Sequence, residues 1–386
     1  MRWFLACAAV AFLACGASCS GTSTPPVERA LGDPNPGLSA AELDAFERGR
    51  GQFERRFNRS EGHGPDFNTS SCRSCHSIPV TGGSSPLYRN FFLVGYEVLG
   101  RLEPGLEGGQ FVARSFSYER TAREAIPADA DVVAQRNAPP TFGMGLLERI
   151  PEEDIRTNED PIDLDGDGIS GRVNRESSAI GRFGYKAQES DLEGFVRGPL
   201  FNHLGITTDP LSLGPRVAGI PTLAQVSAPE EPTTDNDGAP DPELPFQDLS
   251  DLLVFVRGLG PPAPEPMDLA ARRGERIFED VGCVRCHIPS LVRSGKPVLA
   301  YSDLLLHEMG PELADGVDMD LATGSEFRTQ PLWGLRHHAP YLHDGRADTI
   351  EAAILLHGGE AQRSRDDFAA LLDPNRAALV AFLETR

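Results

Sequence analysis

Apolar residues recur at helical spacing in two long segments, one in each half of the chain. The apolar positions of the first segment, residues 39–58, are Leu43, Phe46, Phe53 and Phe57. Those of the second segment, residues 267–287, are Leu269, Ile277 and Phe278. Ser39 is placed to cap the first helix, and Gly282 is placed to end the second. The pattern therefore predicts one amphipathic helix in each half.

Each half also closes on a short amphipathic segment. Residues 246–260 end the first half and residues 374–386 end the chain, with Asp248 and Asn375 near the predicted helix starts. The sequence PPAPEP, residues 261–266, follows the first of these helices and predicts a stiff linker between two units.

The middle of the first half has no such periodicity. Residues 86–245 are rich in Gly, Pro and Asp and contain only short apolar runs, which predicts irregular loops with a few short strands and helices. We therefore predict a mainly α fold with extensive loops and two domains, residues 37–260 and residues 267–386. The first domain is enlarged by this irregular insertion.

Composition excludes one class of partner. The chain has 386 residues, long enough for two or three domains. Asp and Glu number 57 and Lys and Arg 36, giving a formal net charge of −21 with no basic run. A nucleic-acid partner is therefore excluded. An acidic surface suits a soluble exported protein or one that meets basic redox partners.

The first residues read as an export signal. Residues 1–22 contain Arg2, a short apolar run and then small residues with cysteines, and residues 23–36 form a Ser/Thr/Pro-rich tether. A cysteine directly after the apolar run is typical of bacterial lipoproteins, and both Cys15 and Cys19 are candidates for the lipid. The sequence thus predicts a protein on the periplasmic side of a bacterial envelope, anchored by lipid rather than cleaved and released.

Two CxxCH motifs carry the candidate chemistry. They are Cys72, Cys75 and His76 in SSCRSCHSIP, and Cys283, Cys286 and His287 in VGCVRCHIPS. The two thiols of such a motif sit about one helical turn apart, so both can add to one edge of a porphyrin while the histidine reaches the iron. Zinc sites more often use widely separated pairs, and a redox dithiol needs a βαβ context that is absent here. We therefore predict two covalently bound haem c groups in two cytochrome c-like haem domains.

The cysteine count agrees with this prediction. Of the seven cysteines, Cys7, Cys15 and Cys19 belong to the signal region and the other four belong to the two motifs. None remains for a structural disulfide.

Long motifs carry a family resemblance. The segment GSEFRTQPLWGLRHHAPYLHDGRADTIEAAILLHGGEA, residues 324–361, resembles the C-terminal signature of bacterial di-haem cytochrome c peroxidases and MauG-type enzymes. The chain is most similar to their branch of di-haem oxidoreductases, also called thiol oxidoreductases. The shared segments are GPDFNTSSCRSCH, NAPPTFGMGLLERIP, DLDGDGISGR and YSDLLLHEMGPELADG. The resemblance extends from about residue 40 to the C-terminus.

The resemblance implies roles for further residues. His357 stands where the peroxidases have the methionine ligand of the C-terminal haem, which implies that His287 and His357 both bind that iron, with Met309 as the alternative ligand. Such a haem transfers electrons. The pair His337 and His338 is expected to lie in solvent.

The N-terminal haem is then the reactive one, since no nearby residue is assigned to its sixth position. The resemblance implies that the distal pocket of this haem lies around NAPPTFGMGLLERIP. Glu148 in this segment is the candidate general acid and base for splitting peroxide. Met144 or His63 is the alternative, as a cap on this iron. Trp333 is a candidate electron relay between the haems.

A separate loop matches a calcium pattern. In DLDGDGISGRVN, residues 163–174, Asp163, Asp165 and Asp167 supply the first three ligands and the Ile169 carbonyl the fourth, while Asn174 stands at the twelfth position. The pattern predicts a calcium site of weak affinity.

These features together predict an exported di-haem oxidoreductase of the peroxidase and MauG superfamily. It would take electrons from a small donor protein, a cytochrome c or a cupredoxin, and reduce hydrogen peroxide. Two alternatives stay open: an electron carrier without catalysis, and a MauG-like oxidation of a protein or an organic substrate.

Overall fold

The structure is a computed structural model, and it describes residues 30–99, 101–104, 111–121, 126–176, 178–211, 232–291 and 295–386. The predicted signal, residues 1–22, and most of the predicted tether lie outside the described residues, as do the cysteines of the signal. Among the described helices, none is long and apolar enough to cross a bilayer.

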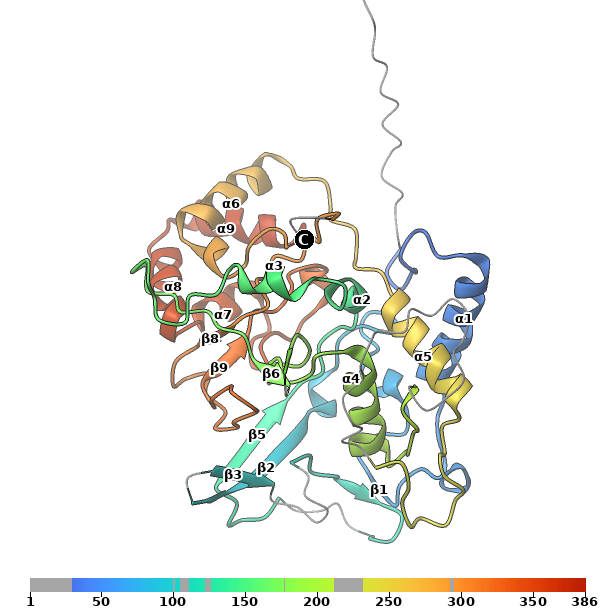
Figure 1. The fold of residues 1–386 in the computed structure, drawn as a ribbon. Helices are drawn as coiled ribbons and strands as arrows, with labels where there is room; N and C mark the ends of the chain where they lie inside the picture. The colour runs from blue at the N-terminus through green and yellow to red at the C-terminus, as the bar shows by residue number, and fades with distance from the viewer. Residues whose placement is uncertain are drawn as a thin grey trace, which may run out of the picture.

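Two crossed helix pairs organise the chain. Helix α1 (Ala40–Glu54) packs against α5 (Phe246–Gly258), and α6 (Leu269–Asp280) packs against α9 (Asp373–Leu383). The pairs lie at opposite sides of the molecule in Figure 1. The four helices predicted from the periodicity therefore exist, and each pair joins the first helix of one half to the closing helix of that half.

The predicted helix start at Ser39 is confirmed. Its side chain accepts a hydrogen bond from the backbone N–H of Glu42, and the Glu42 carboxylate accepts one from the backbone N–H of Ser39. The predicted apolar faces are partly wrong, because Leu43 is 40% exposed and Leu269 is 87% exposed. The phenylalanines and Ile277 carry the burial instead.

A glycine allows the close crossing in each pair. A Cβ on Gly49 would lie 1.9 Å from the carbonyl oxygen of Asp251, and a Cβ on Gly274 would lie 1.9 Å from the carbonyl oxygen of Ala378. In both pairs the next obstacle is the Cβ of a phenylalanine, Phe255 or Phe382. The two halves thus use the same packing solution, in which the helices approach until only hydrogen atoms fit between them.

Short elements fill the region between the pairs. The other α-helices are α2 (Met144–Leu147), α3 (Glu152–Arg156), α4 (Leu192–Pro199), α7 (Ile350–Leu355) and α8 (Gln362–Ala369). Single 3-10 turns are η1 (Arg59–Glu61), η3 (Leu87–Arg89), η7 (Leu335–His337) and η8 (Gly359–Ala361). This content agrees with the predicted fold of helices and extensive loops.

The strands are short and antiparallel. One sheet has the order β3 (Arg101–Pro104), β2 (Phe91–Val98), β5 (Val132–Arg136). The two-stranded sheets pair β1 (Asp66–Phe67) with β4 (Phe116–Ser117), β6 (Arg175–Glu176) with β7 (Ala179–Ile180), and β8 (Leu306–Glu308) with β9 (Glu326–Arg328). Most strands lie within residues 86–245, as the mixed composition of that region predicts.

The hydrophobic cores cross the predicted linker. The larger core surrounds the α1 and α5 pair, yet it also contains Leu304 and Leu305 from the second half. A second core surrounds the α6 and α9 pair. The linker itself is held in place, since the N–H of Glu265 donates to the carbonyl of Thr385 at 2.8 Å and Pro262 packs on Gly334.

A buried ionic contact also joins the two halves. Asp315, whose side chain is 2% exposed, pairs with Arg136 of β5 and with Lys186, whose Nζ lies 3.3 Å from the carboxylate. Burial lowers the pKa of Lys186 to about 8 despite this anion. Buried charges are stable only when paired, so this contact fixes the insertion to the second half.

The glycine crossing gives a direct test within one helix. Gly49→Ala should lower the free energy of unfolding by about 1–3 kcal/mol, because the added methyl overpacks α1 against α5. Gly51→Ala is the control, since a Cβ there meets no atom within 4 Å and alanine favours a helix by up to about 1 kcal/mol. Thermal and denaturant unfolding of both variants measure these changes. A Gly49→Ala variant as stable as the wild type would contradict the packing argument.

Candidate functional site

Each CxxCH motif forms one turn of 3-10 helix, η2 (Cys72–Ser74) or η6 (Cys283–Arg285). The two turns have the same hydrogen bonds. The N–H of His76 donates to the carbonyl of Cys72 at 3.1 Å, and the N–H of His287 donates to the carbonyl of Cys283 at 3.0 Å. Each turn therefore gathers two thiols and one imidazole, as the motif predicts.

The imidazoles of both motifs are fixed through the same ring nitrogen. Nδ1 of His76 lies 3.3 Å from the carbonyl oxygen of Gly83, and Nδ1 of His287 lies 2.9 Å from that of Tyr301. A carbonyl only accepts, so Nδ1 of His287 carries the proton and its Nε2 keeps its lone pair. The ring of His76 also has the carbonyl of Pro139 within hydrogen-bond range. Burial lowers the pKa of each ring to about 4, so both remain neutral at pH 7. This is the form in which histidine binds a metal.

Burial raises the pKa of all four motif thiols. None of them forms a disulfide. Burial raises the pKa of Cys72 to about 12, that of Cys75 to about 11 and that of Cys283 to about 12. A redox dithiol needs a low thiol pKa, so these environments disfavour that alternative.

A cavity of about 220 Å³ lies beside the second motif. Cys283, Cys286 and His287 line one part of it, and His357 lines another. Apolar side chains that also line it include Phe278, Leu313, Phe327, Leu332, Leu342 and Ile354. An apolar chamber with two thiols and facing imidazoles fits a haem, which has a flat apolar ring, two vinyl groups and an iron.

His357 has the ligand form as well. Its Nδ1 lies 2.8 Å from the carbonyl oxygen of Ala353 in α7, which leaves Nε2 free. Burial lowers the pKa of His287 first, and the charge of a protonated His357 lowers it further, so the two rings lie close together. Met309 lines the same cavity. The structure thus brings both candidate ligands to this chamber, and His357 is the one whose donor atom is oriented by a hydrogen bond.

Two other histidines border this cavity. His338 was expected in solvent, but it lines the cavity, and burial lowers its pKa to about 4. The expectation was wrong because a 3-10 turn, η7, directs this part of the chain inward. His343 also lines the cavity and stacks on Phe327 with ring centroids 4.4 Å apart.

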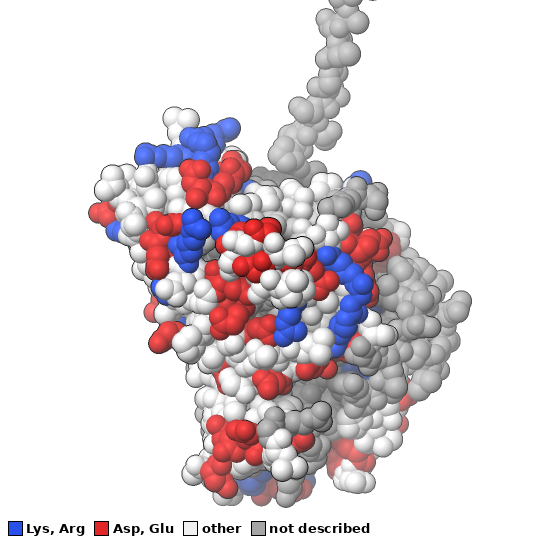
Figure 2. Space-filling view, turned by 60° about the vertical axis from the view of Figure 1, so that its left-hand side comes forward, with Lys and Arg blue, Asp and Glu red and all other residues white. Residues whose placement is uncertain are grey.

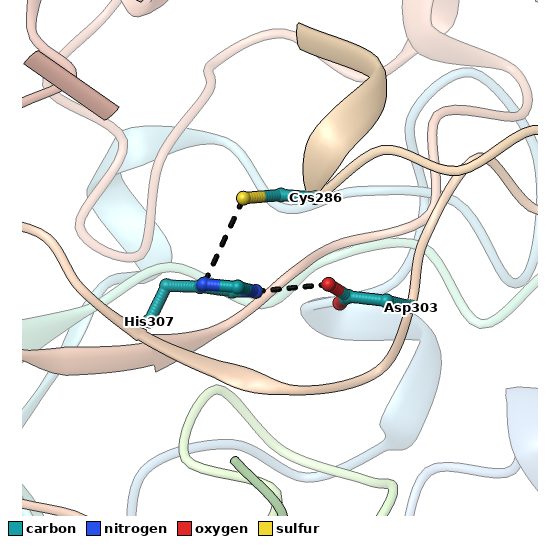
Figure 3. A group of neighbouring side chains, drawn as sticks. All are labelled: Cys286, Asp303 and His307. Carbon is teal, nitrogen blue, oxygen red and sulfur yellow. Dashed lines mark hydrogen bonds and ion pairs between the residues drawn. The ribbon is translucent and has the colours of Figure 1, made fainter. Parts of the chain in front are cut away.

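A buried charged histidine stands next to the second motif (Figure 3). Nε2 of His307 lies 2.9 Å from the Asp303 carboxylate, Nδ1 lies 2.8 Å from the Glu360 carboxylate, and Sγ of Cys286 is 3.7 Å from Nδ1. Burial alone lowers the pKa of His307, but these hydrogen bonds raise it well above its ordinary value. Ligand atoms of Cys286, Asp303 and His307 lie within 4.8 Å of one another. A doubly protonated ring has no lone pair for a metal, so the contacts describe a charge pair rather than an ion site.

The surroundings of the first motif resolve the role of His63. Nε2 of His63 lies 2.9 Å from the carbonyl oxygen of Thr69, and Nδ1 lies 3.0 Å from the hydroxyl of Tyr118. Both ring nitrogens are therefore engaged, and His63 is not available to cap an iron.

Sequence reasoning missed His203. This residue lies in a short π-helix, η4 (Leu200–Leu204), and such helices are frequent at functional sites. The backbone N–H of Asn68, four residues before Cys72, donates to the carbonyl of His203 at 2.8 Å. Burial and the charges of Arg114 and His76 lower the pKa of His203 to about 4, so His203 and His76 lie within electrostatic range. No pattern around His203 in the sequence signals this approach, which depends on the fold.

The proton on His203 is placed differently from those on the other rings. Nδ2 of Asn68 lies 3.2 Å from Nδ1 of His203 and 2.8 Å from the carbonyl oxygen of Ala113, while Oδ1 of Asn68 accepts from the N–H of Ser115 at 2.9 Å. These partners fix the orientation of the amide. Nδ1 of His203 must therefore accept, and Nε2 carries the proton.

The contacts of Glu148 argue against the predicted acid and base role. Its carboxylate forms two hydrogen bonds with Arg257, at 2.8 and 3.0 Å, and also accepts the N–H of Leu192 at 3.1 Å. The side chain is 5% exposed. Since both oxygens are occupied by a bidentate cation, Glu148 anchors α5 and the start of α4.

The predicted calcium loop has a different set of neighbouring carboxylates. Oxygens of Asp160, Asp163 and Asp165 lie within 4.8 Å of one another. Asp167 pairs instead with Arg285 of the second motif, at 3.5 Å. Calcium at this loop stays a prediction, with Asp160 in place of Asp167.

Ile169 and Asn174 of the predicted calcium pattern have further contacts. The side chain of Ile169 lines the cavity beside the second motif. Asn174 is fully buried, and its amide donates to the carbonyl of Lys186 at 2.7 Å. Together with a hydrogen bond of 2.5 Å from Ser170 to Glu360, these contacts make the loop a wall of the second site.

The chain matches one family of known proteins. The sequence profile of the family described as "Di-haem oxidoreductase, putative peroxidase" matches residues 121–386, more than two thirds of the chain. The first CxxCH motif lies before the matched range. A search of curated protein sequences finds no match.

Two solved structures are similar in outline. Hydrazine synthase of Kuenenia stuttgartiensis, pressurised with xenon, is 16% identical with a TM-score of 0.43, covering 99% of this chain and 100% of that chain. A MauG-like protein associated with microbial copper homeostasis is 19% identical with a TM-score of 0.40, and 92% of each chain is covered. At these scores the likeness carries no argument about function.

The charged state of His307 predicts a pH dependence of stability. Its pKa is raised on folding, so its contribution is complete below the pKa of an unfolded histidine, about 6.5, and is lost as the pH rises through the higher folded pKa. His307→Gln should therefore be less stable than the wild type by an amount that is largest below the unfolded pKa of about 6.5 and shrinks as the pH rises through the higher folded pKa. Denaturant unfolding across this range measures the difference, with His337→Gln as control. A difference that stays constant would show that His307 is not charged.

Proposed function

The chain belongs to the di-haem oxidoreductase family, and on this premise we propose that it passes electrons from an external donor through two covalently bound haem c groups to hydrogen peroxide. One observation carries the proposal, an asymmetry between the two sites. His357, which lines the same cavity as His287, has a free Nε2, whereas His203, within electrostatic range of His76, has a protonated one.

Each site would hold one haem in its own cytochrome c-like domain. Cys72 and Cys75 would bind the first haem, with His76 as iron ligand, in residues 37–260. Cys283 and Cys286 would bind the second, with His287 as iron ligand, in residues 267–386. Bound haem supplies an iron that changes oxidation state and, with one face open, accepts a small oxygen ligand.

His287 and His357 would hold the iron of the second haem. His287 and His357 each present a free Nε2 on a ring that a backbone carbonyl holds in orientation. Ligation by both rings leaves no open position and favours electron transfer. Met309 is the alternative ligand.

The first site is built to donate a hydrogen bond. Asn68 holds His203 with its proton on Nε2, which suits a hydrogen bond to an oxygen atom rather than binding to iron. Reduction of one hydrogen peroxide consumes two electrons and two protons and yields two waters. The electrons would come from the donor protein and the protons from solvent, and the neutral ring of His203 would orient the oxygen ligand by this hydrogen bond, a role different from the one predicted for Glu148.

Trp333 connects the two sites. It packs against the larger core, and a Cβ on Gly143 would lie 2.5 Å from its Cζ2. Its neighbour Leu332 belongs to the second core and lines the second cavity. The indole therefore extends from the second half into the first, which supports its assignment as an electron relay.

The donor would be a small basic redox protein, a cytochrome c or a cupredoxin. The formal charge of −21 supports steering of such a partner. Figure 2 shows acidic side chains spread over one face of the described chain, with basic ones between them. The export signal supports a periplasmic location, and Cys15 or Cys19 would bear a lipid anchor.

Electron paramagnetic resonance of the ferric protein tests the function. We expect one high-spin iron from the first site and one low-spin iron from the second. Hydrogen peroxide should change the high-spin signal, and a reduced donor should be oxidised at two equivalents per peroxide. Two low-spin irons that are both inert to peroxide would identify an electron carrier instead.

His357→Ala separates the ligand assignment from the function, because the low-spin signal should be lost while haem stays attached. Met309→Leu is the matched control from the same cavity and should keep the signal. The opposite pattern would assign Met309 as the ligand.

Asn68→Asp tests the proton position on His203. A carboxylate at position 68 would accept from Nδ1, move the ring proton there and free Nε2, so we expect the first iron to become low-spin. The double variant Asn68→Asp with His203→Ala should remain high-spin. A low-spin signal that persists in the double variant would mean that His203 does not face this iron.

A further inference from the structure

Another acidic cluster lies in the insertion, and no step of the proposed function uses it. Carboxylate oxygens of Asp235, Asp241 and Glu243 lie within 4.8 Å of one another. Glu243 is only 9% exposed, and its Oε1 has no hydrogen-bond partner among the described residues. A buried carboxylate oxygen without a partner is costly, which indicates that a positively charged group belongs there.

The chain supplies too few hydrogen-bond donors for the carboxylate oxygens of this cluster. Oε2 of Glu243 accepts from both the N–H and the hydroxyl of Thr207, yet the same hydroxyl lies 2.8 Å from Oδ1 of Asp241. A hydroxyl has one proton and can serve only one of these carboxylates. Burial, opposed by the Thr207 hydrogen bonds and assisted by Asp235 and Asp241, raises the pKa of Glu243 to about 7. Burial also raises the pKa of Asp235.

Three chain segments enclose the cluster. A Cβ on Gly62 would lie 1.9 Å from Cγ of Glu243, so the backbone before His63 packs directly on this side chain. Thr207 lies four residues after His203, beyond the end of the π-helix η4. The cluster therefore connects the loop of residues 235–243 to both segments that approach the first CxxCH motif.

We propose that Asp235, Asp241 and Glu243 bind one divalent cation and that this cation is Ca²⁺. The ligands are oxygen atoms alone, which hard cations prefer, and they come from an irregular loop that suits the flexible coordination of Ca²⁺ better than the strict octahedron of Mg²⁺. The site is separate from the Asp160, Asp163 and Asp165 group, and it does not depend on the proposed function. Bound Ca²⁺ ties the loop of residues 235–243 to the segment that carries His203.

Calorimetric titration of the haem-loaded protein with CaCl₂, after treatment with a chelator, tests the proposal. We expect a site with a dissociation constant of about 10⁻⁴–10⁻³ M, the range of extracellular calcium modules, and a melting temperature that rises with Ca²⁺. Glu243→Gln keeps the shape of the side chain and should abolish this site and its share of the rise. Asp163→Asn, in the other acidic loop, should keep both.

A second variant, Asp235→Asn, tests the same site if Glu243→Gln does not fold. Asp235→Asn changes a less buried ligand and should weaken the same site at least tenfold. Wild-type binding in both variants would overturn the proposal. So would a protein that ignores Ca²⁺ but gains stability as the pH falls through about 7, because the cluster would then be held together by a shared proton.

Discussion

A hydrogen bond at Nδ1 of each histidine decides what that histidine can do. In His287 and His357 a backbone carbonyl accepts a hydrogen bond from Nδ1–H, so Nε2 keeps its lone pair. In His203 a fixed amide donates to Nδ1, so Nε2 carries the proton. The difference in chemistry between the two sites thus arises from which backbone or side-chain group happens to lie beside each ring.

The two helix pairs fix the positions of the CxxCH turns in the same way in both halves. Gly49 and Gly274 let each pair cross at backbone contact, and the 3-10 turn of each CxxCH motif packs against the first helix of its pair. Tight packing leaves little freedom to the turn, and the turn gathers the thiols and the imidazole. Identical packing in both halves therefore yields two similar attachment sites, and the surroundings of each site make them different.

The insertion supplies these surroundings. It contributes His203 to the first site and the Asp160–Ile169 wall to the second, and the buried group of Arg136, Lys186 and Asp315 holds it against the second half. A proline-rich linker in the sequence indicates two independent units. The shared core at Leu304 and Leu305 shows that the halves pack as one body, because apolar burial extends across the linker.

The sequence by itself determined the elements whose cause is local. Helical periodicity, the Ser39 capping box and the spacing of Cys72, Cys75 and His76 depend on residues within a few turns of one another, and each was readable in advance. Likeness to known segments pointed to His357. Only the tertiary structure decided the partners of Glu148, the inward position of His338 and the approach of His203 to the first motif. These depend on contacts between residues far apart in the sequence, such as Glu148 with Arg257 and Asn68 with His203. No local pattern encodes which distant group will neutralise a charge or fix a ring proton.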